Sequence, residues 1–199
     1  MSDASTSTTV EVKVSSIPAH ARPPGGTVGP MPHVERPAMT DYGVPADLDG
    51  ALPWDWAQQR LVANRNYWVV TATPDGRPSA MPVWGVWLPD DHFWFSCSPN
   101  ARKARNIAAN PRCVVTIDDT VECVSVEGVA RSVPAGTEAE AVQRAADAYV
   151  TKYWDDPAVH DEMRTFFTSH ALFEVSPTRA FGIIEREDEF ARRATRWRW

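Results

Sequence analysis

The chain has 199 residues, 43% of them hydrophobic and 23% charged, and its formal net charge is −6. That length and composition suit a single soluble domain with one sizeable core. No apolar run approaches the roughly twenty residues of a membrane-spanning helix, and the N-terminus lacks the basic and apolar layout of a secretory signal. Because nucleic-acid binding needs many spread cations, the negative charge argues against it. We expect a cytoplasmic protein with neither a membrane nor a nucleic-acid partner.

The first 46 residues differ from the rest in composition. They open with serine and threonine and hold seven of the seventeen prolines. Proline removes backbone donors, and the few large apolar residues cannot offset the entropy lost on ordering the segment. We expect a Pro/Ser/Thr-rich tail over 1–46, in which residues 10–14 alternate like a short edge strand, and one cofactor-binding domain over 47–199. The sequence does not distinguish a wrapping arm from a disordered tail.

A helix and two strands are predicted next along the chain. An apolar stripe at helical spacing indicates a helix over 53–61. Runs of aromatic and β-branched residues indicate strands over 67–73 and 79–88, and Gly76 lies in the turn between them, where a positive φ is needed.

The second of these strands has an unusual composition. Pro82 cannot donate to a ladder, and Gly85 has no side chain to pack. Such a strand suits an exposed backbone, against which a planar ligand could lie, with Trp84 and Trp87 offering faces for stacking. The alternative is that these tryptophans pack in the core, as most of the nine in the chain must.

A basic helix start follows the apolar strand at 92–97. Arg102, Lys103 and Arg105 lie in the first turns of a predicted helix that Ser98 or Asn100 could cap. A helix N-terminus already carries partial positive charge and unpaired N–H groups, so three cations there indicate a bound anion such as phosphate. A solvated basic face is the alternative.

The spacing of the cysteines and histidines predicts neither a metal site nor a disulfide. None of the five histidines has zinc-type spacing with another histidine or cysteine. On the predicted hairpin, Cys113 would face Val126 and lie about 10 Å from Cys123, so both should stay reduced. Cys97 belongs to the predicted phosphate turn, although a free cysteine more often packs as a small apolar residue.

The C-terminal half is expected to complete the sheet. A capping box at Thr137 opens a helix to about residue 153, a second helix covers 157–168, and both should wall a substrate cavity. Strands are predicted over 171–175, 180–184 and 190–199. On the last strand Trp197 and Trp199 share one face, where they could cover a planar ring or only plug the barrel.

Several motifs in this order resemble the pyridoxamine 5'-phosphate oxidase-like superfamily of split β-barrel flavoproteins, over about residues 53–199. They are Asn66-Tyr67-Trp68, Asp75-Gly76-Arg77-Pro78, Met81-Pro82-Val83-Trp84-Gly85-Val86-Trp87, Arg102-Lys103-Ala104-Arg105-Asn106, Asn110-Pro111-Arg112 and Val126-Glu127-Gly128. The ending Ala194-Thr195-Arg196-Trp197-Arg198-Trp199 is similar to the actinobacterial branch that uses the deazaflavin coenzyme F-420.

The resemblance implies a mainly β (α+β) fold, a homodimer of six-stranded antiparallel split β-barrels with peripheral helices and cofactor sites at the dimer interface. With the residues above, it assigns cofactor binding to Met81, Pro82, Val83, Trp84, Ser96, Cys97, Ser98, Arg102, Lys103, Asn106, Trp197 and Trp199. Relatives often have serine or threonine where this chain has Ala101, so one hydrogen bond to phosphate should be missing.

Three functions remain open from the sequence. The first is a coenzyme F-420-dependent reductase that transfers hydride to a conjugated C=C or similar bond of a small molecule, with the basic groove holding the phosphate and glutamate tail of the coenzyme. The second is an FMN-dependent oxidase or reductase, and the third a non-catalytic flavin, deazaflavin or haem-binding protein. In a reductase the cofactor carries the hydride chemistry, and we find no nucleophile set or paired carboxylates. Tyr149, Tyr153 and His170 are possible proton donors, but each is more often structural.

Overall fold

The computed structural model describes residues 29–199, and the strand predicted at residues 10–14 lies outside them. The strands are β1 (His33–Glu35), β2 (Asn66–Ala72), β3 (Pro78–Trp87), β4 (Phe93–Cys97), β5 (Arg112–Ile117), β6 (Glu122–Val133), β7 (Ala171–Ile184) and β8 (Thr195–Arg198). The helices are η1 (Thr40–Tyr42), α1 (Trp54–Ala63), α2 (Arg102–Ala109), α3 (Ala139–Tyr153), η2 (Pro157–Val159), α4 (His160–Ser169) and α5 (Phe190–Arg193). Every helix in this range is too short or too polar to cross a lipid bilayer.

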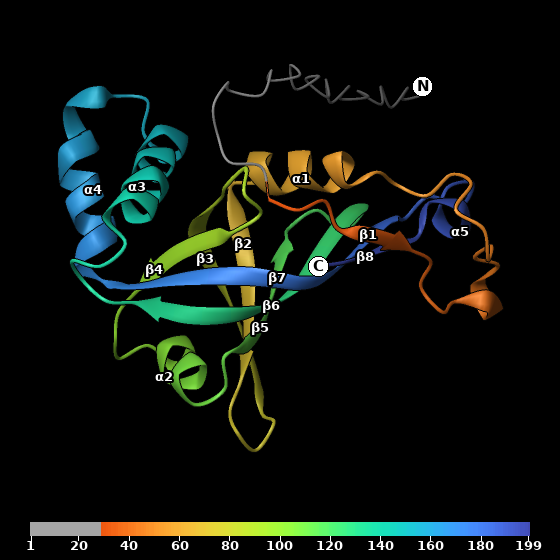
Figure 1. The fold of residues 1–199 in the computed structure, drawn as a ribbon, viewed down its shortest axis with the longest axis horizontal. Helices are drawn as coiled ribbons and strands as arrows, with labels where there is room; N and C mark the ends of the chain where they lie inside the picture. Colours follow the sequence, from red (N-terminus) through yellow and green to blue (C-terminus); the bar gives the residue numbers. More distant parts are fainter. Residues whose placement is uncertain (1–28) are drawn as a thin grey trace, which may run out of the picture.

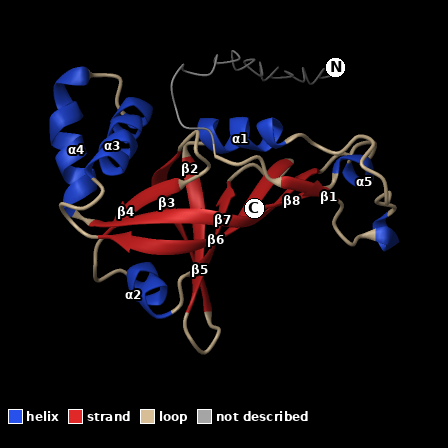
Figure 2. Cartoon of the chain, viewed as in Figure 1, coloured by secondary structure: helices blue, strands red, loops and turns tan. Residues whose placement is uncertain are grey.

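All eight strands form one antiparallel sheet in the order β1-β8-β7-β4-β3-β2-β5-β6, and β6 pairs back onto β7. The pairing closes a barrel of six strands, with β8 and β1 as two extra strands beside β7. The prediction of a six-stranded antiparallel barrel with peripheral helices is therefore confirmed. The helices surround the strands: α3 and α4 lie at one end, α5 at the other, and α1 and α2 on opposite sides (Figures 1 and 2).

The barrel interior combines aliphatic side chains with several large aromatic rings. Tyr67, Phe93 and Phe95 are completely buried within it. Helix α1 contributes the indole of Trp54, whose ring meets those of Trp197 and Trp199 at centroid distances of 5.3 and 4.7 Å. The apolar stripe predicted for α1 is thus the face that covers this end of the barrel.

A second apolar cluster lies outside the barrel, between the sheet and helices α3 and α4. Val86, Trp94 and Leu172 point out from β3, β4 and β7 into this layer. Tyr149 of α3 stacks on Phe167 of α4 at 4.2 Å, which joins the two helices. The helices therefore cover the outer face of three barrel strands.

Two strand predictions near the C-terminus are wrong. Residues 171–184 form one strand, because Pro177 lies at a register shift where β7 bulges against Gly128 and Glu127. A bulge lets a proline without an N–H remain in a continuous ladder. Residues 190–193 form α5, so the last strand begins only at Thr195.

The register of the β5–β6 hairpin also differs from the prediction. Cys113 pairs with Gly128, two positions beyond Val126. The connecting turn is longer than the four residues 118–121 on which that prediction rested, and within it Asp119 folds back and accepts the N–H groups of Val121 and Glu122. The three cysteines are free, as expected.

The described part of the predicted tail is joined to the barrel. Strand β1 pairs with β8 along its whole length. The Arg36 guanidinium donates to the carbonyl oxygens of Asp47, Asp49, Arg192 and Ala194 at 2.6–2.8 Å. These bonds hold residues 33–49 against the C-terminal segment.

We expect Gly182→Ala to lower the free energy of unfolding by about 1–3 kcal/mol, because a Cβ there would overpack the barrel. It would lie 2.6 Å from a ring carbon of Trp197 and 3.2 Å from one of Trp56. Urea unfolding of the variant measures the loss. The double variant with Gly182→Ala and Trp197→Phe should lose less free energy of unfolding than the two single variants together, because the smaller phenylalanine ring leaves room for the new Cβ. Unchanged stability of the single variant would contradict this packing.

Candidate functional site

The backbone of β3 is open along most of its length. It pairs with β2 from Pro78 to Trp84, but with β4 only from Gly85 to Trp87. The end of β4 pairs instead with β7, where Ser96 faces Leu172 and Cys97 faces Ala171. In the described chain the second edge of residues 78–84 therefore has no strand beside it, as Pro82 and Gly85 led us to expect.

Most side chains along the open part of β3 are exposed. Val83 is the only buried residue of 78–84, whereas Met81 is 50% exposed and Trp84 47% exposed. Trp87 is buried in the core and offers no face to a ligand, so the stacking role predicted for it is wrong. The barrel closes around Trp87, because β4 pairs with β3 there.

The start of α2 carries uncompensated positive charge. Its first turn has no acidic residue and its N-cap, Ala101, makes no side-chain bond. Arg102 and Lys103 form no ion pair or side-chain hydrogen bond with any residue of 29–199. The partial positive charge of the helix end adds to theirs, so an anion would be bound strongly.

Three other residues of this region are already engaged. The capping prediction is wrong, because Ser98 Oγ accepts the N–H of Asn100 within the turn before the helix. The Arg105 guanidinium donates to the Asn100 carbonyl, which leaves it less free than Arg102. Asn106 is buried, and its Nδ2 donates to Thr71 Oγ1 at 2.9 Å, so it ties α2 to β2. These contacts position the two free cations.

Cys97 behaves as a packing residue in this structure. It packs against the barrel core beside Ala101. Burial raises the pKa of its thiol, and the nearby Lys103 only partly opposes that rise. The thiol therefore stays protonated at neutral pH, and any ligand contact from Cys97 would come from its backbone.

Trp197 of β8 and Trp199 just after it lie on one face, where both contact the ring of Trp54, but they differ in exposure. Trp197 is completely buried, in a slot that the missing side chain of Gly182 provides. We therefore correct its assignment from cofactor binding to the core. Trp199 is half-buried and lines a groove of about 590 Å³ on the outside of β2, β5 and β6, together with Arg112 and Arg198.

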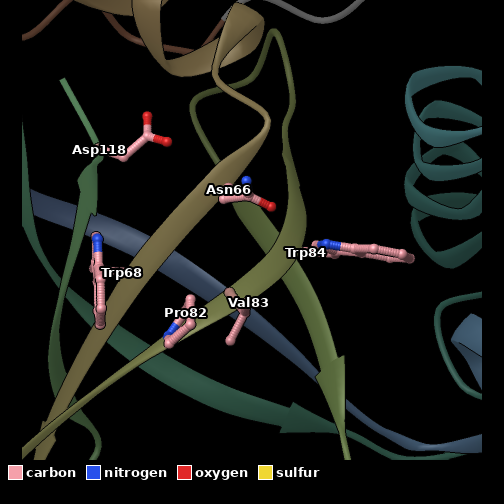
Figure 3. Close-up of a pocket in the computed structure, with 6 residues that line it drawn as sticks. All are labelled: Asn66, Trp68, Pro82, Val83, Trp84 and Asp118. Carbon is pink, nitrogen blue, oxygen red and sulfur yellow. The ribbon is translucent and has the colours of Figure 1, made fainter.

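A pocket of about 480 Å³ lies on the outer face of β2 and β3 (Figure 3). Its lining consists of Asn66, Trp68, Pro82, Val83, Trp84 and Asp118. The indole of Trp84 stacks on Tyr153 of α3 at 5.1 Å and 15°, and meets Trp154 edge-on. Sequence reasoning missed Trp68, although the ladder places it opposite Pro82 on the same face.

The three candidate proton donors make structural contacts. Tyr153 OH accepts the N–H of Gly85 at 2.9 Å and donates to the Arg65 carbonyl at 2.6 Å. Burial raises the pKa of Tyr149 and Tyr153 to about 12. His170 Nδ1 donates to the Phe166 carbonyl at 2.7 Å. Each group has a protein partner or a buried ring, which favours the structural interpretation.

Lys152 is partly buried next to these tyrosines and has no carboxylate contact among the described residues. Its Nζ donates to Tyr67 OH at 2.6 Å and to the Val62 carbonyl at 3.1 Å. Burial, with a smaller effect from Arg65, lowers the pKa of Lys152 to about 7. The amine therefore loses much of its charge near neutral pH.

Comparison with known proteins gives one family and several solved structures. The family model described as pyridoxamine 5'-phosphate oxidase matches residues 56–182. A conserved hypothetical protein of Mycobacterium tuberculosis is 22% identical, with 66% of this chain and 82% of that chain covered and a TM-score of 0.52. No curated protein matches the chain.

Two further solved structures are less similar in shape. The haem storage protein HutZ of Vibrio cholerae is 18% identical, with 62% of this chain and 86% of that chain covered and a TM-score of 0.47. An F-420 reductase is 24% identical, with 61% and 94% covered and a TM-score of 0.43. Of these three structures, the mycobacterial protein shares the fold of this chain.

We expect Lys152→Met to raise the free energy of unfolding at pH 7 by about 1–2 kcal/mol, because it removes a partly buried amine with no counter-ion among the described residues. Between a folded pKa of about 7 and the ordinary 10.5, the unfolded chain binds a proton that the folded chain lacks. The stability of the wild type therefore rises with pH through this range, and the advantage of the variant should shrink. Urea unfolding of both proteins from pH 6 to 10 measures it, and a pH-independent difference would contradict the assignment.

Proposed function

We propose that this chain, which belongs to the pyridoxamine 5'-phosphate oxidase family, is a reductase that uses the deazaflavin coenzyme F-420. Its substrate would be a small molecule with a conjugated C=C or a similar electron-poor bond. The observation that carries the proposal is the pair of uncompensated cations, Arg102 and Lys103, at the start of α2, close in the chain to the end of β4. The open edge of β3 beside β4 supports a ring site next to it.

The residues at the start of α2 fit an anionic coenzyme. Charge-assisted hydrogen bonds from Arg102 and Lys103 would hold a phosphate, and the free N–H groups of the first helical turn would add to them. The same positive region suits a tail of carboxylates. Ala101 contributes no side-chain bond there, so the two cations would carry most of the affinity.

The open part of β3 fits the ring of such a coenzyme. Backbone groups of residues 78–84 that face away from β2 are available to polar ring edges. Met81 and Trp84 are exposed beside them and would exclude water from the ring. This strand would therefore orient the ring, while α2 holds the phosphate.

When bound in its reduced form, the coenzyme supplies a hydride. Arg102, Lys103 and the open part of β3 would hold the coenzyme so that this hydride could reach an electron-poor carbon of the substrate, and water would supply the proton. The chain has to bind and orient both molecules and exclude bulk water. A proton from solvent is consistent with the structural contacts made by Tyr149, Tyr153 and His170.

We expect Arg102→Ala with Lys103→Ala to raise the dissociation constant of coenzyme F-420 by at least 100-fold, because each charge-assisted bond contributes about 1.5–3 kcal/mol. Titration calorimetry measures the affinity, and the variant should fold normally because neither side chain is buried. Arg192→Ala, which removes an exposed cation near the opposite end of the molecule, is the control. Unchanged coenzyme affinity in the double variant would overturn the phosphate assignment.

The colour of the purified protein, its affinity for FMN and its ability to oxidise the reduced coenzyme separate the alternative functions. A protein that is yellow as purified and binds FMN more tightly than the deazaflavin would be an FMN-dependent enzyme. A protein that binds the coenzyme but never oxidises its reduced form in the presence of a panel of enones and quinones would be a carrier. We expect oxidation of the reduced deazaflavin and no direct reaction with NADPH.

We also expect the protein to be a homodimer, in line with what the family resemblance implies. The groove on the outside of β2, β5 and β6 supports this, because it combines exposed Val129 with Val70 and Val114. Arg112, Glu127, Arg179 and Arg198 line the same groove, so a partner that covers it would meet both apolar and charged side chains. Light scattering should give about twice 22.1 kDa, and a stable monomer that still reduces substrate would contradict a site shared between two copies.

A further inference from the structure

We propose that the pocket between Trp68 and Trp84 binds the substrate, and that the substrate is a flat fused-ring compound without negative charge. This inference rests on the proposed function, because it names the substrate class of the same site. Its basis is an aromatic surface that is exposed, held in place and bordered by one acid. Figure 3 shows the six side chains of this pocket.

The ladder between β2 and β3 creates the aromatic surface. Trp68 lies opposite Pro82, and Asn66 lies opposite Trp84. Because side chains alternate along a strand, these four project from one face while Tyr67 and Val83 point into the barrel. In Figure 3 the ring of Pro82 lies between the indoles of Trp68 and Trp84, where it adds an apolar floor to the pocket.

Contacts from α3 hold the Trp84 indole in place. Tyr153 stacks on it almost parallel, and Trp154 meets it at 77°. Tyr153 is fixed in turn, because its hydroxyl bonds to the backbone of Gly85 and Arg65. Trp84 nevertheless remains 47% exposed. A ring that stacks on it would lose little binding energy to ordering the side chain.

The charge around the pocket selects against anions. Asp118 is the one ionisable residue that lines it, and Asn66 supplies an amide that can donate or accept. Arg65 lies over the Tyr153 ring at 5.2 Å but does not line the pocket. A neutral or cationic ring system therefore fits better than one that carries a sulfonate or carboxylate.

The pocket also adjoins the strand that the proposed function gives to the coenzyme ring. Pro82 and Trp84 belong to the part of β3 whose second edge is open. A flat substrate on Trp84 would therefore lie along the same strand as the deazaflavin. Hydride transfer needs the two rings to be neighbours.

The direct test measures ring binding to the full-length protein without coenzyme. Proflavine, a flat three-ring cation, is titrated and followed by fluorescence anisotropy, with anthracene-2-sulfonate as the anionic counterpart. We expect Trp84→Ala to weaken proflavine binding at least tenfold and Trp84→Phe, which keeps a stacking ring, less than threefold. Phe166→Ala, which removes an equally exposed ring on α4, should leave the affinity unchanged.

The outcomes separate this inference from the proposed function. Equal proflavine affinity in the wild type and Trp84→Ala would overturn the inference, as would tighter binding of the sulfonate than of proflavine. If Trp68→Ala dissociated the dimer and left proflavine binding unchanged, a second copy would occupy the pocket and the inference would also fail. The variant with Arg102→Ala and Lys103→Ala should lose its affinity for the coenzyme and retain its affinity for proflavine. The coenzyme assignment and the substrate pocket are therefore tested by two separate binding measurements.

Discussion

The ladder between β3 and β4 stops at Gly85, and the arrangement of the site depends on how that residue is held. A Cβ at this position would lie 2.4 Å from the ring of Phe93, so only glycine lets that ring enter the core beside the strand. The N–H of Gly85 is then taken by Tyr153 OH. Helix α3 therefore supplies a hydrogen bond at the point where β4 turns away, and Tyr153 also fixes the Trp84 ring. One tyrosine links the open strand edge to the aromatic surface.

The two ends of the site make opposite demands on a ligand. At α2 the cations Arg102 and Lys103 repel the helix end by about 0.3–1 kcal/mol each, and an anion would relieve that repulsion. The bond from Asn106 to Thr71 and the burial of Ile107 hold the helix in spite of it. On β3 the surface is aromatic and nearly uncharged. A molecule with a phosphate at one end and a flat ring at the other satisfies both.

Local patterns predicted the elements near the site because the deciding contacts are close in sequence. Pro82 and Gly85 limit the ladder of their own strand, and the basic residues of α2 are read directly from its first turn. The burial of Trp197 could not be read in this way, because it depends on Gly182 on a neighbouring strand and Trp54 near the other end of the chain. The continuity of β7 through Pro177 likewise depends on where β6 places its bulge. Trp68 could have been found from the sequence, had the hairpin register been used to place it opposite Pro82.

The opposite end of the barrel is held by many long-range contacts, and this explains how the site end can leave strand edges unpaired. Arg36 bonds to four carbonyl oxygens from two distant segments, and Thr195 Oγ1 accepts the N–H of Leu52. Asp91 accepts the indole N–H groups of Trp54 and Trp87, which ties α1 to the β3–β4 turn. The bonds of Thr195 and Asp91 are buried, so each of these is costly to break. The barrel therefore stays closed where it is held by them, and β3 can diverge from β4 at the other end without opening the core.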